Sequence, residues 1–221
     1  MKKKTMFGLT AGVLLCAALG FLGFFVLRFQ RTSPERLPDR YGGQVEQVRS
    51  HVDRDGDGLD DQRDILEGAL AYIATCPKYK SKYYPTGYPD DGYGVCTDVV
   101  ANGMRQAGYD LMSLVQEDIR ENPEGYEIAD PDPSIDFRRV RNLKVYFAHT
   151  AIPLTTDLSQ IEEWQGGDIV IFQSHIGIVS DRRNADGVPY VIHHNDPWQK
   201  AYEQDILEKR DDLVAHYRVT E

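Results

Sequence analysis

The sequence predicts an α+β fold in which helices come first along the chain and a small antiparallel sheet follows. Apolar residues recur at helical spacing in several segments between residues 43 and 149. Short segments rich in β-branched and aromatic residues come later, bounded by Gly, Asp, Asn and Pro, which is typical of strands joined by tight turns. Helices followed by strands indicate α+β rather than alternating α/β.

The length and charge of the chain limit its function. With 221 residues, it has room for one domain of roughly 150 residues beside an N-terminal segment. The formal net charge is −10, but the first 40 residues hold seven Lys/Arg and two Asp/Glu, which leaves 18 basic against 33 acidic residues beyond. Such an acidic domain should repel nucleic acid, so we expect no nucleic-acid partner.

The N-terminus has the composition of a membrane anchor. Met6 through Leu27 is a run of 22 uncharged residues that as a helix would span about 33 Å, enough to cross a bilayer. We therefore expect residues 1–28 to be a single-pass transmembrane signal-anchor in a bacterial cell membrane, with the domain outside the cytoplasm. A signal peptide cleaved near Ala18 is the alternative. Residues 29–42 are polar and hold two prolines, which predicts a stalk.

Residues 43–64 are predicted to form a helix and an EF-hand-like calcium loop. Val45, Val48 and Val52 have the spacing of a short amphipathic helix. The acidic run after them, DRDGDGLDDQRD, places oxygen ligands at the alternate positions that calcium requires, with a glycine at the bend. A solvated acidic turn is the alternative. The expected ligands are Asp53, Asp55, Asp57, the backbone carbonyl of Leu59, Asp61 and Asp64.

Four helices and four strands are expected in the rest of the chain. The helices cover residues 62–75, a segment starting near Cys96, and residues 110–121 and 138–149. The strands are the segments DIVIFQ, HIGIVSD, PYVIHH and AHYRVT.

Cys96 is the candidate nucleophile. It lies in GVCTDVV, where a glycine-rich loop gives way to a helical pattern, so its sulfur should lie at a helix N-terminus, where the thiolate is favoured. The alternatives are an inert buried thiol or a disulfide with Cys76. The later segments GGDIVIF, SHIGIVSD and PYVIHH favour catalysis, because they place histidines on or beside adjacent strands.

These strand segments resemble the core of the NlpC-type cell-wall cysteine peptidases. More closely, GVCTDVV, PDPSIDFRRVRNL, GGDIVIF, HIGIVSDRR and AHYRV together resemble the bacterial family called domain of unknown function 1287, over about residues 65 to 219. The resemblance implies a papain-like catalytic domain over residues 65–221. Its N-terminal helices would carry the nucleophile and pack on the antiparallel sheet.

The resemblance orders three catalytic residues, Cys96 as nucleophile, His175 as base and His193 as the residue that orients the base. His194 followed by Asn195 is a second candidate for the third position, and it would point to the opposite face of the strand. The chain departs from the family pattern here and at Arg141, where proline is usual.

Further polar residues are candidates for catalysis or substrate binding. Tyr93 could supply a hydroxyl to the substrate, and Asp98 could cap the Cys96 helix. Asp136, Arg138 and Arg139 could clamp a substrate carboxylate or form an internal salt-bridge cluster.

The predicted activity is thiolate acyl transfer that hydrolyses amide bonds. The resemblance, together with the expected placement outside the membrane, implies peptidoglycan stem peptides as substrate. The acidic loop predicts structural calcium, and we expect no organic cofactor. One alternative is a non-enzymatic, calcium-clipped surface binding module with Cys76 and Cys96 in a disulfide. Another is a zinc site that uses Cys96, His175 and His193 or His194. The oligomeric state is left open.

Overall fold

The computed structural model describes residues 15–25 and 32–221. Residues 15–25 are helical, and their apolar side chains are exposed. No helix within the described ranges combines the length and apolar character needed to cross a membrane. The other parts of the predicted span, residues 6–14 and 26–27, lie outside the described residues.

The helices lie close to their predicted positions. Asp60 caps the first helix of the domain, since its side chain accepts a hydrogen bond from the backbone N–H of Arg63. A four-residue helix at Pro133–Asp136 was not predicted; the proline at its start suits a helix N-terminus. The helices are α2 (Asp61–Ala74), α3 (Cys96–Gln106), α4 (Leu111–Glu121), α5 (Pro133–Asp136) and α6 (Val140–Thr150). Short 3₁₀ turns cover Pro123–Gly125, Ile161–Glu163 and Leu207–Lys209.

The main sheet has six strands in the order β3-β8-β4-β5-β6-β7, and every neighbouring pair is antiparallel. This confirms the α+β prediction. The strands are β3 (Ile152–Pro153), β4 (Ile169–Phe172), β5 (Ile176–Arg183), β6 (Pro189–Ile192), β7 (Glu203–Gln204) and β8 (Leu213–Arg218). Two short strands ahead of α3, β1 (Lys78–Tyr79) and β2 (Tyr93–Gly94), pair in parallel.

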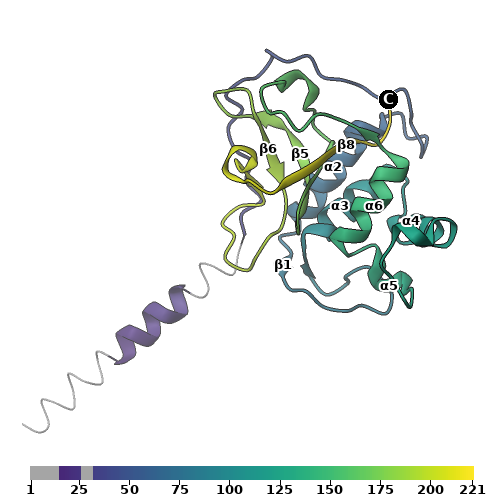
Figure 1. Cartoon of the computed structure of the whole chain (residues 1–221). Coiled ribbons are helices and arrows are strands. Elements are labelled where there is room, and N and C mark those ends of the chain that lie inside the picture. Colours follow the sequence, from purple (N-terminus) through teal and green to yellow (C-terminus); the bar gives the residue numbers. More distant parts are fainter. Residues whose placement is uncertain (1–14, 26–31) are drawn as a thin grey trace, which may run out of the picture.

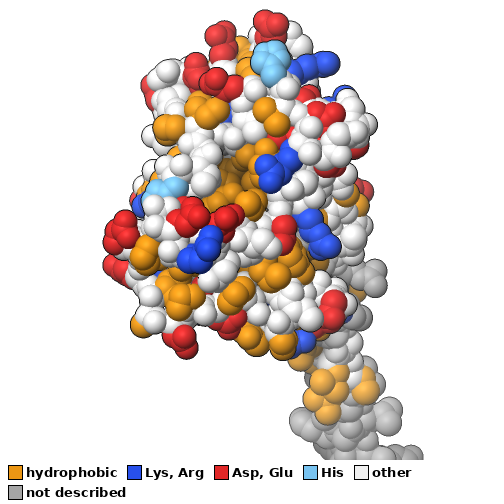
Figure 2. All heavy atoms as spheres, turned by 90° about the vertical axis from the view of Figure 1, so that its right-hand side faces the viewer, with side chains coloured by type: hydrophobic (Ala, Val, Ile, Leu, Met, Phe, Trp, Pro, Cys, Tyr) orange, Lys and Arg blue, Asp and Glu red, His pale blue; other side chains and the backbone are white. Residues whose placement is uncertain are grey.

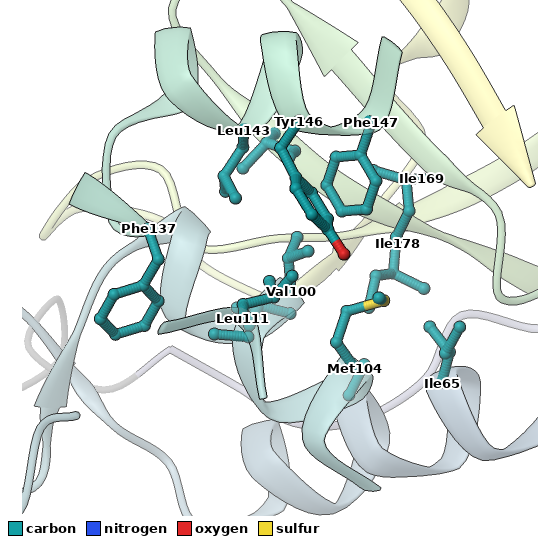
Figure 3. Packing of buried hydrophobic residues seen from close by; sticks show 14 of the residues in the cluster. Ile65, Val100, Met104, Leu111, Phe137, Leu143, Tyr146, Phe147, Ile169 and Ile178 are labelled. Atoms are coloured by element: carbon teal, nitrogen blue, oxygen red, sulfur yellow. The ribbon is translucent and has the colours of Figure 1, made fainter. Parts of the chain in front are cut away.

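The helices cover one face of this sheet. In Figure 1, α2, α3 and α6 lie together beside β5 and β8. Figure 3 shows Ile65 of α2, Met104 of α3 and Phe147 of α6 converging with Ile169 and Ile178 of the sheet. Close packing of α2 on α3 depends on Gly68, because a Cβ there would lie 2.4 Å from Cβ of Gln106.

The other face of the sheet is also buried. Ile169 and Ile171 belong to the core under the helices, whereas Val170 and Phe172 belong to a second cluster with Trp164. This alternation follows from the two-residue period of a strand, and it explains why the whole segment is apolar.

The stalk prediction is wrong for residues 32–42, which pack on the domain. Arg36 forms salt bridges with Asp181 and with the buried carboxylate of Glu203, the latter at 2.8 Å. Ser33 pairs in parallel with Ala201. The polar composition of this segment therefore reflects ion pairing with the sheet rather than a free linker.

The helix predicted near residues 43–52 is absent, and the segment is irregular. Val48 and Val52 remain exposed, at 42 and 38 %. Without an apolar surface to cover, their helical spacing brings no stabilisation. The backbone instead bonds to distant groups; for example, the N–H of His51 donates to the carbonyl of Glu221.

The surface of the domain mixes charges of both signs. Figure 2 shows acidic, basic and hydrophobic side chains interspersed on one face of the molecule. Arg120 on α4 illustrates the pattern, since its guanidinium lies near Glu117 and Glu121, and all three side chains are exposed. Such exposed pairs contribute little to stability.

Candidate active site

Cys96 is the first residue of α3, as predicted. Val95 before it has extended backbone, and its N–H donates to the Asp98 carboxylate at 2.8 Å. Asp98 thus caps the helix from its first turn, which confirms that candidate role. Gly94 is required before this turn, because a Cβ there would lie 2.0 Å from the Tyr72 hydroxyl.

A buried ion pair holds the first turn of α3. The Arg138 guanidinium donates to both Asp98 oxygens, at 2.7 and 2.9 Å, and both side chains are almost completely buried. Arg138 also donates to the carbonyl of Lys82 at 2.8 Å and lies over the Tyr84 ring. Arg138 therefore belongs to an internal salt bridge that positions the nucleophile helix, rather than to a substrate clamp.

Asp136 and Arg139 form a separate local pair. The Arg139 guanidinium donates to Asp136 at 3.1 Å, and the other Asp136 oxygen accepts the N–H of Asp132 at 2.7 Å. Asp136 is buried, and its bonds lie within and beside α5. These contacts favour the internal interpretation for both residues.

His175 and His193 are hydrogen-bonded to each other. His175 immediately precedes β5, and His193 immediately follows β6, the neighbouring strand. Nε2 of His175 lies 2.9 Å from Nδ1 of His193, and both side chains are buried. The sulfur of Cys96 lies at the same point of the sheet, because the backbone N–H of Ile176 interacts with it. The structure thus places Cys96 beside the start of β5, directly after His175, and His175 against His193.

His194 points elsewhere, as the alternation of a strand requires. Its ring packs edge-on against Tyr79 and Tyr202, with ring centroids 5.3 and 5.0 Å away. Asn195 is exposed, and its amide donates to Asp196 at 3.0 Å. His193, rather than the His194–Asn195 pair, is therefore the hydrogen-bond partner of His175.

The pKa values of Cys96, His175 and His193 do not favour the thiolate that the sequence predicts at Cys96. Burial raises the pKa of Cys96 to about 11, although the N–H groups of Ile176 and Thr97 act in the opposite direction. Burial lowers the pKa of His175 to about 4, and the neighbouring positive charge of Arg210 lowers it further. The pKa of His193 is lowered well below its ordinary value, again by burial first. At neutral pH the site therefore holds a thiol beside two neutral imidazoles.

Several residues beside the site have no signal in the sequence. Burial and the neighbouring Cys96 raise the pKa of Tyr79, which keeps its hydroxyl protonated. Arg210 and Asp212 form a salt bridge of 2.6 Å next to His175, and Arg210 lies over the Phe172 ring. Tyr79 lies in a two-residue strand far from any recognisable motif, so only the fold brings it to Cys96.

Tyr93 lies in β2, which pairs with the strand of Tyr79. The amine of Lys80 lies 5.2 Å from the centre of the Tyr93 ring, and the backbone N–H of Tyr93 donates to the Asp91 carboxylate. The two tyrosines lie on neighbouring strands ahead of α3.

The metal alternatives separate clearly. In the described part of the chain, the carboxylates of Asp53, Asp55 and Asp57 form the sole group of three ligand side chains with their ligand atoms within 4.8 Å of one another. Cys96 and the histidines do not form such a group among the described residues. Cys76 and Cys96 are both free thiols, so the structure does not contain the disulfide of the binding-module alternative.

The buried histidines predict a loss of stability in acid. His175 and His194 both have a pKa near 4 in the folded chain, against about 6.5 when unfolded. The unfolded chain therefore takes up protons first as the pH falls from 6.5 to 4, and stability is lost across that window. At pH 5 the cost is about 2 kcal/mol for each histidine. Asp64 changes the stability in the opposite direction. Its pKa is raised to about 6 in the folded chain, so the folded chain takes up this proton first, and stability is gained as the pH falls below about 6.

Urea unfolding at pH 7 and pH 5 measures this loss. His194→Phe should reduce the difference between the two pH values, since it removes one titrating group and keeps an aromatic ring. An unfolding free energy equal at both pH values would show that the histidines are not buried in neutral form.

Comparison with known proteins gives a family but no activity. A model of the family described as "Domain of unknown function (DUF1287)" matches residues 66–219. An Escherichia coli (strain K12) relative, "Uncharacterized protein YijF", is 37% identical over 167 aligned positions, and the match covers 70% of this chain and 80% of the relative. No solved structure gives a significant match. The matched family region includes Cys96, His175 and His193 and begins after the acidic loop.

Proposed function

The chain belongs to the DUF1287 family, and from the geometry of its site we propose that it is a cysteine hydrolase that cleaves amide bonds. The observation that carries the proposal is the hydrogen bond between His175 and His193 beside a cysteine that opens a helix. Nucleophile, base and orienting residue in this order are the recurring elements of acyl transfer by a thiol. The papain-like, NlpC-type fold is part of the same proposal, supported by the helix-then-sheet order.

The hydrogen bond defines the role of each histidine nitrogen. For Nδ1 of His175 to accept a proton, its Nε2 has to carry a hydrogen, which it donates to Nδ1 of His193. His193 then fixes the tautomer and the ring orientation of His175. This tautomer leaves Nδ1 as the basic nitrogen of His175.

The reaction starts from the neutral pair. As the Cys96 sulfur attacks the amide carbonyl carbon, Nδ1 of His175 takes the thiol proton, and the carbonyl oxygen becomes an oxyanion. His175 then gives that proton to the leaving amine as the C–N bond breaks, which leaves a thioester on Cys96. Water attacks the thioester, with His175 as base, and releases the carboxylic acid and the thiol.

Two donors are available for the oxyanion. The backbone N–H of Cys96 lies in the first turn of α3, where N–H groups lack intrahelical partners. The Tyr79 hydroxyl stays protonated near Cys96 and is the second donor. Each such donor contributes about 3 kcal/mol in well-studied enzymes.

The proposed substrate is the stem peptide of peptidoglycan, at the outer face of a bacterial membrane. The uncharged run from Met6 to Leu27 supports anchoring there, and the acidic composition of the rest argues against nucleic acid. Amide bonds between amino acids of the cell wall are the substrates that suit this location.

Digestion of purified peptidoglycan in H₂¹⁸O tests the substrate. We expect released fragments with a new amine and a new carboxyl group, and one ¹⁸O atom in that carboxyl. Mass spectrometry of the fragments identifies the bond. The proposed substrate would be contradicted if the peptidoglycan fragments were cut at glycosidic bonds, or if the folded protein released no fragments from peptidoglycan.

A further inference from the structure

The acidic loop ahead of α2 is folded back on itself. The Asp53 carboxylate accepts the N–H groups of Gly56 at 2.8 Å and Gly58 at 3.0 Å. Both glycines have positive φ, +76° and +94°, which other residues adopt only with strain. The turn brings the carboxylates of Asp53, Asp55 and Asp57 within 4.8 Å of one another, all exposed to solvent.

Asp64 is the independent observation that turns this cluster into a site. It lies in the first turn of α2, is only 1 % exposed, and neither of its carboxylate oxygens has a hydrogen-bond partner. α2 begins directly after the acidic loop, and Asp57 and Asp55 are the charged groups that act most strongly on the Asp64 carboxylate. A buried carboxylate without a partner is costly, and a bound cation would remove that cost.

We propose that Asp53, Asp55, Asp57 and Asp64 bind one calcium ion. The four carboxylates occupy positions 1, 3, 5 and 12 of a twelve-residue loop, the spacing that surrounds calcium in EF-hands. The donor set is oxygen only, which suits a hard cation, and an irregular arrangement of carboxylates suits calcium better than magnesium, which demands near-octahedral geometry.

Asp61, a further predicted ligand, also holds the loop through both of its carboxylate oxygens. One of its oxygens accepts the N–H of Arg54 at 2.8 Å, and the other accepts the Tyr109 hydroxyl. Leu59 is held by the Asp57 carboxylate, which accepts its N–H at 2.8 Å.

The same loop is joined to the end of the nucleophile helix. The Arg54 guanidinium donates to the carbonyl of Gly108 at 3.1 Å and lies 4.5 Å from the Tyr109 ring centre. Gly108 and Tyr109 come directly after Ala107, the residue that ends α3. A calcium ion in the loop would therefore fix α2 against α3, and its role is structural.

Calorimetric titration of the full chain in detergent, after treatment with EGTA, tests the site with calcium chloride as the probe. One ion should bind per chain. At calcium concentrations 100 times the dissociation constant, the melting temperature should rise by about 5 to 10 °C, because the ion stabilises only the folded loop. Magnesium should give a smaller rise.

Substitutions of the carboxylates distinguish stabilisation by bound calcium from stabilisation by the turn itself. Asp64→Asn should raise the melting temperature in EGTA, because it removes a buried charge, and should abolish the rise caused by calcium. Asp55→Asn should also abolish that rise, whereas Asp130→Asn, at an exposed aspartate outside the loop, should keep it. The proposal is overturned if millimolar calcium neither binds nor stabilises, or if both loop variants keep the full shift.

Discussion

Hydrolysis is expected to fall by about 10²- to 10⁴-fold when His175 is replaced by alanine, because a positioned acid–base group contributes about that factor. Without His175, no group accepts the thiol proton of Cys96, whose pKa of about 11 leaves little thiolate at neutral pH. Steady-state rates on peptidoglycan fragments at pH 7 measure the loss. At high pH the variant should regain part of the rate, since hydroxide then ionises the thiol directly.

His193 and His194 provide the matched comparison. His193→Ala should lower kcat strongly, because the His175 tautomer is no longer fixed, and His193→Asn should restore part of it by accepting a hydrogen bond. His194→Phe should cost less than tenfold, since His194 packs on tyrosines and makes no contact with His175 at hydrogen-bond distance. If His194→Phe lowers kcat more than His193→Ala does, the assignment of His193 as the residue that orients His175 is wrong.

Arg138→Ala is expected to lower the free energy of unfolding by about 3–5 kcal/mol, the usual cost of leaving one member of a buried ion pair without its partner. The Asp98 carboxylate would stay buried without its two guanidinium bonds. Denaturant unfolding measures the change. Arg120→Ala is the control, since its exposed ion pairs should contribute less than about 1 kcal/mol.

Arg138→Lys distinguishes charge from geometry. A lysine keeps the positive charge but cannot donate in a bidentate fork, so we expect a stability between those of the wild type and the alanine variant. A loss below 1 kcal/mol in Arg138→Ala would show that the pair does not hold the first turn of α3.

The sequence predicts the regular elements well because their signals are local. Residues 62–75 become α2 at Asp61–Ala74, and the four apolar segments become β4, β5, β6 and β8. The pattern of α2 indicates the side that this helix buries, whereas β4 and β6 are apolar throughout because both of their faces are buried. The predicted helix near Val48 fails because nothing covers its apolar residues.

Other features depend on contacts between distant parts of the chain. The sequence predicts that Arg36 belongs to a polar stalk, because only the folded chain places Glu203 beside it. The two candidates His193 and His194 are adjacent in sequence, and only the pairing of β5 with β6 decides which one meets His175. The raised pKa of Cys96 follows from burial by the assembled sheet, which a helix-start motif does not reveal.

The central claim is that Cys96 is the nucleophile. The measurement that tests it most directly is the rate of amide cleavage in peptidoglycan by Cys96→Ala, compared with the rate of Cys76→Ala. The unfolding curve of each variant confirms that it is folded. Cys76 is an exposed free thiol, so its replacement controls for the loss of a cysteine. We expect Cys76→Ala to cleave at the wild-type rate and Cys96→Ala to release no fragments above background. Wild-type cleavage by folded Cys96→Ala would contradict the mechanism.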